Sequence, residues 1–267
     1  MSLPDELVEL AARKLFQAEA TREQIGLLSL QYPDASIDEG YQIQQALIEL
    51  KEQSGLKRKG WKIGLTSRAM QQALGIETPD SGILFDNMFF ENGSRVPSDR
   101  FIQPRVEAEI AFVLKRELSG EVTIFDVLDA TDYVCPALEI LDTRIKRVDE
   151  KTGKRRNVFD TISDNAANGG IVVGGRPMRP LDVDMTRAGV AVSKNGWIEE
   201  TGLGAGVLGN PALAIVWLSR RLGQYGGRLS AGDVVLSGSF IRPVEAGHGD
   251  TIMADYGSFG SVSIYFE

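Results

Sequence analysis

The sequence predicts an α+β fold in which a small helical N-terminal part packs on a larger β-rich core. Apolar residues recur at helical spacing in the first sixty residues, and period-two alternation is common after about residue 80. Gly-Asp and Asn-Gly pairs mark turns between the later segments. Because successive strands are rarely separated by helices, most of the sheet is expected to be antiparallel. The helical part spans residues 1–80 and the core spans 81–267, and the two are expected to form one integrated domain.

The helical part is predicted to contain two main helices, a strand and a short third helix. Ser36 and Glu39 form a capping box, in which each side chain accepts from the other residue's free backbone N–H, and they begin the second helix. In the strand over residues 61–65, Lys62 points away from the face that its apolar neighbours share. A short helix ending near Gly75 follows. The first helix carries the apolar stripe Leu7, Leu10, Ala11 and Leu15.

The first half of the core alternates between strands and one helix. Residues 106–114 alternate at their start and predict a strand. Residues 123–133 predict a helix with an aspartate in its first turn, and Pro136 is expected to start a strand over 137–141. The apolar run 171–173 predicts a further buried strand.

The last part of the chain is strand and turn around a single helix. Asn195-Gly196 is a strong hairpin signal, and Asn210-Pro211 is expected to begin a helix that runs to Gly223. Residues 204–209 match the letters of a dinucleotide-binding fingerprint. They follow a hairpin and precede a separate helix start, so we interpret them as a glycine loop.

Composition excludes several functional classes. The 267 residues include 37 Asp and Glu against 29 Lys and Arg, a net charge of -8, with one His and one Cys. A single cysteine excludes a disulfide framework and a cysteine zinc cluster, and favours the cytoplasm. The acidic balance argues against nucleic-acid binding. No apolar run is long enough for a membrane span, and the acidic N-terminal residues are unlike a signal peptide.

Three glutamates form the main candidate site. Glu107 and Glu109 lie at i and i+2 of a predicted strand, with Cα atoms about 6.5–7 Å apart on one face. Glu139 lies between apolar residues in a strand that is expected to be buried, where a carboxylate needs a partner. Carboxylate oxygens select hard cations such as Mg2+ or Mn2+. The alternative is that these residues form an ordinary solvated strand face.

Further polar residues have both a functional and a simpler interpretation. Lys62 could orient an anionic substrate or move a proton with its pKa lowered by burial, or it could lie on the wet face of its strand. Asp80 could be a general base on a loop or a turn residue. His248 is interpreted as an exposed turn residue and Cys135 as a small buried hydrophobe. The turn 237–240 could offer N–H groups and hydroxyls to a carboxylate, or be structural.

Four ordered motifs resemble a known family. They are KIGLTS at residues 62–67, PRVEAE at 104–109, DYVCPALE at 132–139 and FDTISDNAAN at 159–168. Together they are similar to the hydratase/decarboxylase family of aromatic meta-cleavage pathways, within the fumarylacetoacetate hydrolase superfamily. The resemblance extends over nearly the whole chain.

The resemblance implies a mixed, mostly antiparallel β-roll core of the fumarylacetoacetase C-terminal type. It also implies a divalent metal, usually Mg2+, and a large homo-oligomer of the decamer class that associates with a pathway decarboxylase. The implied site residues are the metal ligands Glu107, Glu109 and Glu139, the acid/base pair Lys62 and Asp80, and the substrate-binding Ser163 and Ser239.

The implied reaction is metal-assisted addition of water to a 2-hydroxy-2,4-dienoate by way of its 2-oxo-enoate tautomer. The expected case converts 2-oxo-hept-4-ene-1,7-dioate to 4-hydroxy-2-oxoheptane-1,7-dioate, with Lys62 holding the enolate and Asp80 moving a proton or orienting water. A 4-oxalocrotonate-type decarboxylase and a 2-oxopent-4-enoate hydratase are the alternatives. Hydrolysis is disfavoured because hydrolases of the superfamily use a Glu-His pair and no histidine precedes His248. The intact glutamates disfavour a non-catalytic subunit.

A basic segment bears on the choice of substrate. Residues 144–156 hold seven basic residues and two acids in an otherwise acidic chain. An arginine could bind the second carboxylate of a dicarboxylic substrate through two parallel hydrogen bonds, and the candidates are Arg144, Arg147 and Arg242. The alternative is a solvated charged loop.

Overall fold

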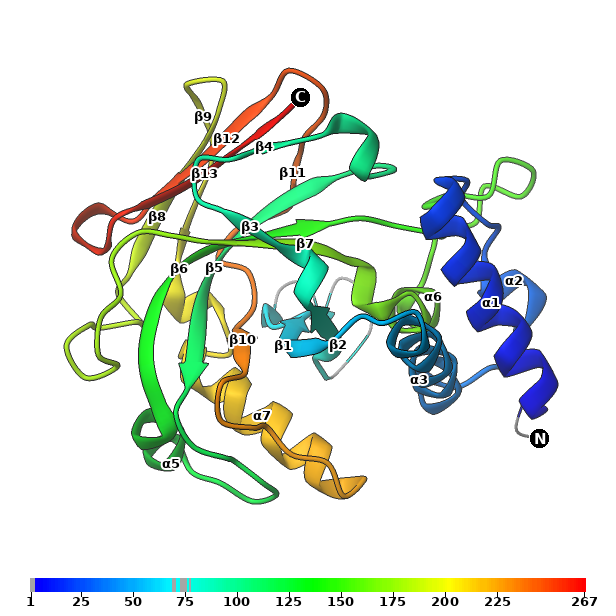
Figure 1. The fold of residues 1–267 in the computed structure, drawn as a ribbon, viewed down its shortest axis with the longest axis horizontal. Helices are drawn as coiled ribbons and strands as arrows, with labels where there is room; N and C mark the ends of the chain where they lie inside the picture. The colour runs from blue at the N-terminus through cyan, green and yellow to red at the C-terminus, as the bar shows by residue number, and fades with distance from the viewer. Residues whose placement is uncertain (1–2, 69–70, 73–75, 77) are drawn as a thin grey trace.

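The computed structural model describes every residue except 1–2, 69–70, 73–75 and 77, so the short helix expected to end near Gly75 lies outside the described residues. The strands form an eight-stranded and a five-stranded sheet (Figure 1). The larger sheet has the order β2 (Asp80–Phe85), β1 (Arg58–Gly64), β10 (Val234–Leu236), β5 (Arg105–Leu114), β6 (Thr131–Leu141), β7 (Asn168–Val173) and β3 (Phe89–Glu91), and β11 (Val244–Glu245) also pairs with β5. The smaller sheet has the order β4 (Arg95–Val96), β13 (Ser261–Phe266), β12 (Thr251–Asp255), β8 (Gly189–Lys194) and β9 (Trp197–Leu203).

The pairing confirms a mixed and mostly antiparallel core. Three pairs are parallel, namely β1 with β10, β3 with β7, and β4 with β13. The central pairs β5–β6 and β6–β7 are antiparallel. Apolar side chains from both sheets and from the helix after β9 meet in one large core cluster, which includes Phe112, Leu138, Ile215 and Phe266.

The helices gather in two places. Figure 1 shows α1 (Asp5–Thr21), α2 (Leu28–Gln31), α3 (Ile37–Gln53) and α6 (Val158–Ser163) at one end of the molecule, beside the N-terminus, whereas α5 (Ile124–Ala130) and α7 (Pro211–Gln224) lie on the side away from the smaller sheet. The predicted capping box is confirmed, because Ser36 accepts from the Glu39 N–H and Glu39 accepts from the Ser36 N–H. Among the described residues, no helix combines the length and the apolar character that a membrane crossing requires.

The strand β1 ties the helical part to the end of the chain. It pairs with β2 on one side and with β10 on the other, and Lys62 lies opposite Leu236 in the register. The residues before and after position 80 therefore share the larger sheet.

The helix predicted over residues 123–133 is wrong in its last three residues. Thr123 caps the helix by accepting from the Asp126 N–H, as a helix start requires. The helix ends at Ala130, and Tyr133 pairs with Val113 in the β5–β6 ladder. Strand pairing thus overrides the local helical pattern where β-branched and aromatic residues begin.

The prediction that Pro136 precedes its strand is also wrong, because Pro136 lies inside β6. Its carbonyl accepts from the Gly174 N–H at 3.0 Å, just beyond the last β6–β7 pair of Ala137 with Val173. The N–H and C=O of one strand residue point to the same side of the strand. An N–H at position 136 would therefore point past the end of β7, where no β7 residue pairs with it. No rung of that ladder is lost.

The signals near the C-terminus are confirmed. Asn195 and Gly196 have φ values of 53° and 85° between β8 and β9, as a two-residue hairpin turn requires. Asn210 caps α7 by accepting from the Ala212 N–H, and Pro211 is its first residue. Residues 204–206 form a short 3-10 turn between β9 and α7, not a phosphate loop after a parallel strand.

We expect Gly60→Ala to destabilise the larger sheet severely. A Cβ atom at Gly60 would lie 1.8 Å from the Val234 carbonyl oxygen, so β1 and β10 could not stay paired. The free energy of unfolding should fall by about 3 kcal/mol, and the melting temperature by about 10 °C. Calorimetry tests this against Gly26→Ala, where nothing lies within 4 Å of the new Cβ. Equal melting temperatures for the two variants would contradict it.

Candidate metal centre and active site

Two neighbouring strands bring the three predicted glutamates together. Glu107 and Glu109 lie on β5, and Glu139 lies on β6 directly opposite Glu107. Each residue offers a carboxylate oxygen, and these oxygens all lie within 4.8 Å of one another. Antiparallel pairing of β5 with β6 therefore adds Glu139 to the two glutamates on one face of β5 and completes a cluster of three carboxylates.

The cluster is buried and has free oxygens. Glu109 and Glu139 are fully buried and Glu107 is half-buried. Oε2 of Glu139, Oε1 of Glu109 and Oδ1 of the nearby Asp80 lack a hydrogen-bond partner among the described residues, whereas Oε1 of Glu139 forms an ion pair with Lys62 at 3.2 Å. Burying such oxygens without partners costs several kcal/mol. This is the arrangement expected of ligands for a cation.

Burial and mutual repulsion disfavour the charged forms of these acids. Burial, with the Glu139 charge adding to it, raises the pKa of Glu107 to about 8. Burial and the two neighbouring carboxylates raise the pKa of Glu109 well above its ordinary range. Burial also raises the pKa of Glu139, against the opposing effect of Lys62. A positive charge among the three would reverse these shifts.

Lys62 extends from β1 into this cluster and is 3% exposed. Its Nζ lies 3.2 Å from Oε1 of Glu139 and donates to the Ala166 carbonyl at 3.1 Å. Burial alone would lower the pKa of Lys62, but the surrounding carboxylates outweigh it and raise that pKa. In the metal-free protein the shift is thus opposite to the lowering that burial alone predicts. In the metal-free protein Lys62 is therefore a buried cation.

Asp80 is the first residue of β2, not a loop residue, and pairs with Gly64 at the end of β1. It is 2% exposed, and burial raises its pKa against the opposing effects of Lys62 and Arg156. A Cβ atom at Gly64 would lie 2.2 Å from Oδ1 of Asp80. The glycine therefore makes room for the carboxylate beside Lys62.

The turn after β10 holds Glu109. The Gly238 N–H donates to Oε2 of Glu109 at 2.7 Å, which supports the prediction that this turn offers N–H groups to a carboxylate. The Ser239 hydroxyl, the predicted substrate contact, donates to the Ile241 carbonyl and accepts from the Ile241 N–H. The buried Ser237 hydroxyl has no partner among the described residues, so Ser237 is the freer donor of the two.

Ser163 lies at the end of α6 and is fully buried. Its hydroxyl donates to the Phe159 carbonyl one helical turn earlier, at 2.8 Å. That bond occupies the donor that a substrate contact would need.

The contacts of Arg144 leave little for the predicted substrate carboxylate to bind. Its side chain is 3% exposed and its Nε lies 2.5 Å from Oδ1 of Asp164. The other nitrogens donate to the carbonyls of Asp164 and Asn168 at 2.7 Å and 2.8 Å. Arg242 is placed unfavourably for the opposite reason, because its side chain is 80% exposed and pairs with Glu200. The partners of Arg144 and Arg242 are distant in sequence, so the sequence alone does not show which arginines are engaged in ion pairs.

Two other arginines of the basic segment form fewer hydrogen bonds and ion pairs than Arg144. Arg156 donates to the Thr143 hydroxyl at 2.7 Å, and no acid of the described chain forms an ion pair with it. Arg147 donates to the Gln103 carbonyl, while its Nε is buried without a partner. Burial lowers the pKa of Arg147 to about 10, with repulsion from Arg105 and Arg156 adding to the shift.

The remaining single residues are as predicted. His248 is exposed in a turn after β11. Cys135 is 2% exposed on β6, and burial raises the pKa of its thiol to about 12. Sequence reasoning missed the segment Asn165–Ala167. All three residues have positive φ, and the Ala166 carbonyl accepts a hydrogen bond from Lys62 Nζ. The one feature of the sequence that could have drawn attention to this segment is its position within the motif FDTISDNAAN at 159–168.

Comparison with known proteins agrees with the four motifs. The family model described as fumarylacetoacetate (FAA) hydrolase C-terminal matches residues 59–264. The chain is 51% identical over 258 residues to 2-oxo-hept-4-ene-1,7-dioate hydratase of Escherichia coli, covering 96% of this chain and 97% of that protein. It is 40% identical over 260 residues to 2-keto-4-pentenoate hydratase of Paraburkholderia xenovorans, covering 97% and 94%.

A solved structure resembles the whole fold. It is 4-oxalocrotonate decarboxylase from Pseudomonas putida G7, complexed with magnesium and adipate, with a TM-score of 0.93 and 33% identity. The match covers 100% of this chain and 99% of that one, so it includes the N-terminal helices and both sheets. The same enzyme is also known with calcium and acetate. The chain belongs to the fumarylacetoacetate hydrolase family, and its relatives over nearly its whole length are hydratases and a decarboxylase.

Proposed function

We propose that the chain is a divalent-metal-dependent hydratase that converts 2-oxo-hept-4-ene-1,7-dioate to 4-hydroxy-2-oxoheptane-1,7-dioate in aromatic catabolism. The observation that carries the proposal is the three-carboxylate cluster with Lys62 and Asp80 beside it. The hydratase of Escherichia coli, at 51% identity, supports this choice of reaction.

Glu107, Glu109 and Glu139 would hold Mg2+ or Mn2+. Their free buried oxygens are of the type that hard divalent cations prefer, and the relative solved with magnesium supports Mg2+. A bound cation would supply Lewis-acid stabilisation of negative charge on the C2 oxygen of the substrate.

Lys62 and Asp80 would manage charge and protons. In its protonated form, Lys62 could donate from Nζ to the oxygen that becomes negative when the dienol tautomerises. Asp80 has an unpartnered Oδ1 and a raised pKa, so it can carry the proton to C5 and orient the water that adds at C4. The reaction needs no imidazole, and the exposed His248 takes no part.

The product of a defined substrate tests this function. Purified protein with Mg2+ and 2-oxo-hept-4-ene-1,7-dioate should lose the substrate and form the 4-hydroxy-2-oxo acid, measured by absorbance and mass spectrometry. The second candidate is 4-oxalocrotonate-type decarboxylation, which the similarity to the decarboxylase structure supports. Release of CO2 from the six-carbon 4-oxalocrotonate, with no product heavier than the substrate by one water, would favour it over hydration. Activity that survives exhaustive chelation would refute the metal site.

We expect Mg2+ to bind more tightly as pH rises. The raised pKa of Glu107, about 8, means that the folded metal-free protein holds a proton that the ion must displace. The Kd for Mg2+ should therefore decrease as pH rises from 6 to 8. The same shift should make the metal-free protein less stable as pH rises from the ordinary pKa of 4.5 to about 8. Calorimetry in two buffers measures the released protons, and a Kd independent of pH would contradict the prediction.

We propose Arg156 as the cation that binds the distal carboxylate of a dicarboxylic substrate. It has no acid partner among the described residues, and its charge acts on Asp80. We expect Arg156→Gln to raise KM for the seven-carbon dioate about 30-fold, the value of one charge-assisted hydrogen-bond pair. KM for 2-hydroxypenta-2,4-dienoate should change less than about 2-fold. Steady-state kinetics tests this against Arg155→Gln, an exposed neighbour. Equal effects on both substrates would favour the five-carbon 2-oxopent-4-enoate reaction.

We also propose a cytoplasmic homo-oligomer of the decamer class. Trp197 and Ile198 are 79% and 62% exposed on β9, an edge strand of the smaller sheet. Exposed apolar side chains on an unpaired edge favour coverage by another chain. Light scattering of the pure protein measures the assembly. Co-purification with a pathway decarboxylase tests the proposed association with that enzyme.

A further inference from the structure

The connection between α6 and β7 has an unusual backbone. Asn165, Ala166 and Ala167 have φ values of 50°, 53° and 56°, so three consecutive residues adopt the left-handed conformation. Two of them are alanines, for which this region is unfavourable. Such a segment persists only where its surroundings hold it.

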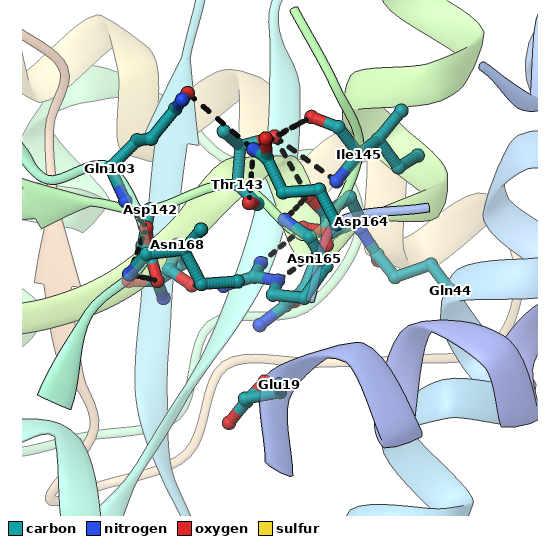
Figure 2. Close-up of polar contacts among 12 residues, drawn as sticks. Glu19, Gln44, Gln103, Asp142, Thr143, Ile145, Asp164, Asn165 and Asn168 are labelled. Carbon is teal, nitrogen blue, oxygen red and sulfur yellow. Dashed lines mark hydrogen bonds and ion pairs between the residues drawn. The ribbon is translucent and has the colours of Figure 1, made fainter. Parts of the chain in front are cut away.

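Arg144 holds the segment from one side through Asp164 and Asn168, which flank it. Figure 2 labels these two residues together with Asn165. Its Nη2 donates to the Asp164 carbonyl and its Nη1 to the Asn168 carbonyl, so one guanidinium bridges the two ends of the left-handed turn. Its Nε and its backbone N–H both donate to the Asp164 carboxylate. These groups are buried, where charge-assisted hydrogen bonds are strong.

The strand β2 holds the segment from the other side. The Asn165 side chain donates to the Ile83 carbonyl at 3.0 Å and accepts from the Ile83 N–H at 2.8 Å, as a neighbouring strand would. The approach is close enough that a Cβ atom at Gly82 would lie 2.5 Å from the Asn165 carbonyl oxygen. The turn is therefore fixed between Arg144 and β2.

The fixed turn points one carbonyl at the candidate active site. The Ala166 oxygen accepts from Lys62 Nζ at 3.1 Å, and the same Nζ lies 3.2 Å from Glu139. A backbone carbonyl cannot change rotamer, so its position sets where the ammonium group rests. In an ordinary right-handed turn that carbonyl would point elsewhere.

We propose that Arg144 and Asp164 are positioning residues for Lys62, which act by clamping the left-handed turn Asn165–Ala167 so that its Ala166 carbonyl fixes the Lys62 ammonium group. The inference rests on the proposed function, because it assumes that Lys62 acts in the hydration reaction. It assigns Arg144 to an internal clamp and leaves substrate recognition to other residues.

Arg144→Lys is the first test. A lysine keeps the charge beside Asp164 but cannot bridge two carbonyls, because it has one nitrogen where arginine has three. We expect kcat to fall about 30-fold or more, with KM within about 3-fold of the parent value. A crystal structure should show Ala166 O farther from Lys62 Nζ than 3.1 Å. The Mg2+ Kd, measured by calorimetry without substrate, should not change.

A double-mutant cycle separates positioning from a general loss of stability. If Arg144 acts through Lys62, Arg144→Lys should reduce kcat less than about 3-fold in a Lys62→Met background. A merely structural role would produce the same 30-fold loss in both backgrounds. Lys194→Met is the control, because it breaks a partly buried ion pair with Asp250 in the smaller sheet. It should lower the melting temperature and leave kcat unchanged.

The outcomes distinguish this inference from the proposed function. If Lys62→Met retains full activity, the proposed role of Lys62 fails. If Lys62→Met is inactive but Arg144→Lys is fully active with Ala166 O in place, the clamp is refuted and the function stands. Should Arg144→Lys not fold, Asp164→Asn removes the carboxylate with little change in shape. Parental kcat in that folded variant would equally overturn the proposal.

Discussion

Glu109→Gln is expected to abolish binding of Mg2+ and to lower kcat/KM at least about 1000-fold. Glu109 is fully buried, one oxygen accepts from Gly238, and the other oxygen is free toward Glu107 and Glu139. The amide keeps the shape but removes the charge that a hard divalent cation requires. Isothermal titration with Mg2+ and a hydration assay at saturating Mg2+ measure the two effects.

The same variant has an opposite expected effect on the metal-free protein. Removing one of three buried, mutually repelling carboxylates should raise its melting temperature at a pH where the parent's carboxylates are ionised. The parent should gain about 2.7 kcal/mol at a Mg2+ concentration 100 times its Kd, and Glu109→Gln should gain nothing. Glu91→Gln is the control, since Glu91 is exposed on β3. A Mg2+-dependent rise in the melting temperature of Glu109→Gln would contradict the assignment.

Lys62→Met is expected to lower kcat about 1000-fold while leaving Mg2+ bound at least as tightly as in the parent protein. The methionine fills the space of the aliphatic chain but lacks the Nζ that lies between Glu139 and the Ala166 carbonyl. Loss of a positive charge beside the carboxylates favours a bound cation, so activity and metal affinity should separate.

Lys59→Met is the matched control, because Lys59 lies on the same strand with its side chain exposed. It should match the parent in kcat and in melting temperature. The metal-free Lys62→Met protein should be less stable by about 3–5 kcal/mol, the usual cost of leaving a buried charge without its partner. Weaker Mg2+ binding together with near-normal kcat would show that Lys62 serves the metal site and not the reaction.

Local patterns predicted the parts of the site that lie on strands. Alternation on β5 places Glu107 and Glu109 on one face, and the apolar neighbours of Glu139 indicate its burial. Lys62 could be singled out by the same logic. These inferences need only the two-residue period of a strand.

Other features depend on contacts that no local pattern encodes. The partner of Arg144 is Asp164, twenty positions later in the sequence. The left-handed turn at Asn165–Ala167 contains no glycine, the residue that usually indicates such a conformation. Lys62 has a raised pKa because acids from three other strands surround it, which cannot be read from its apolar neighbours in sequence. Proline is tolerated inside β6 because the pairing of β6 with β7 ends at Ala137 and Val173. The sequence does not show where that pairing ends, so its local pattern predicts that Pro136 precedes the strand.

The position of Lys62 also constrains when the site can form during synthesis. Its strand, β1, is held on one side by β2 and on the other by β10, whose residues 234–236 are synthesised long after Lys62. Contacts between segments this distant in sequence are slow to form and cannot precede the later segment. A nascent chain that has already made Glu107, Glu109 and Glu139 therefore still lacks half of the support for Lys62. The carboxylate cluster and its buried cation should become a functional unit only after β10 has been synthesised.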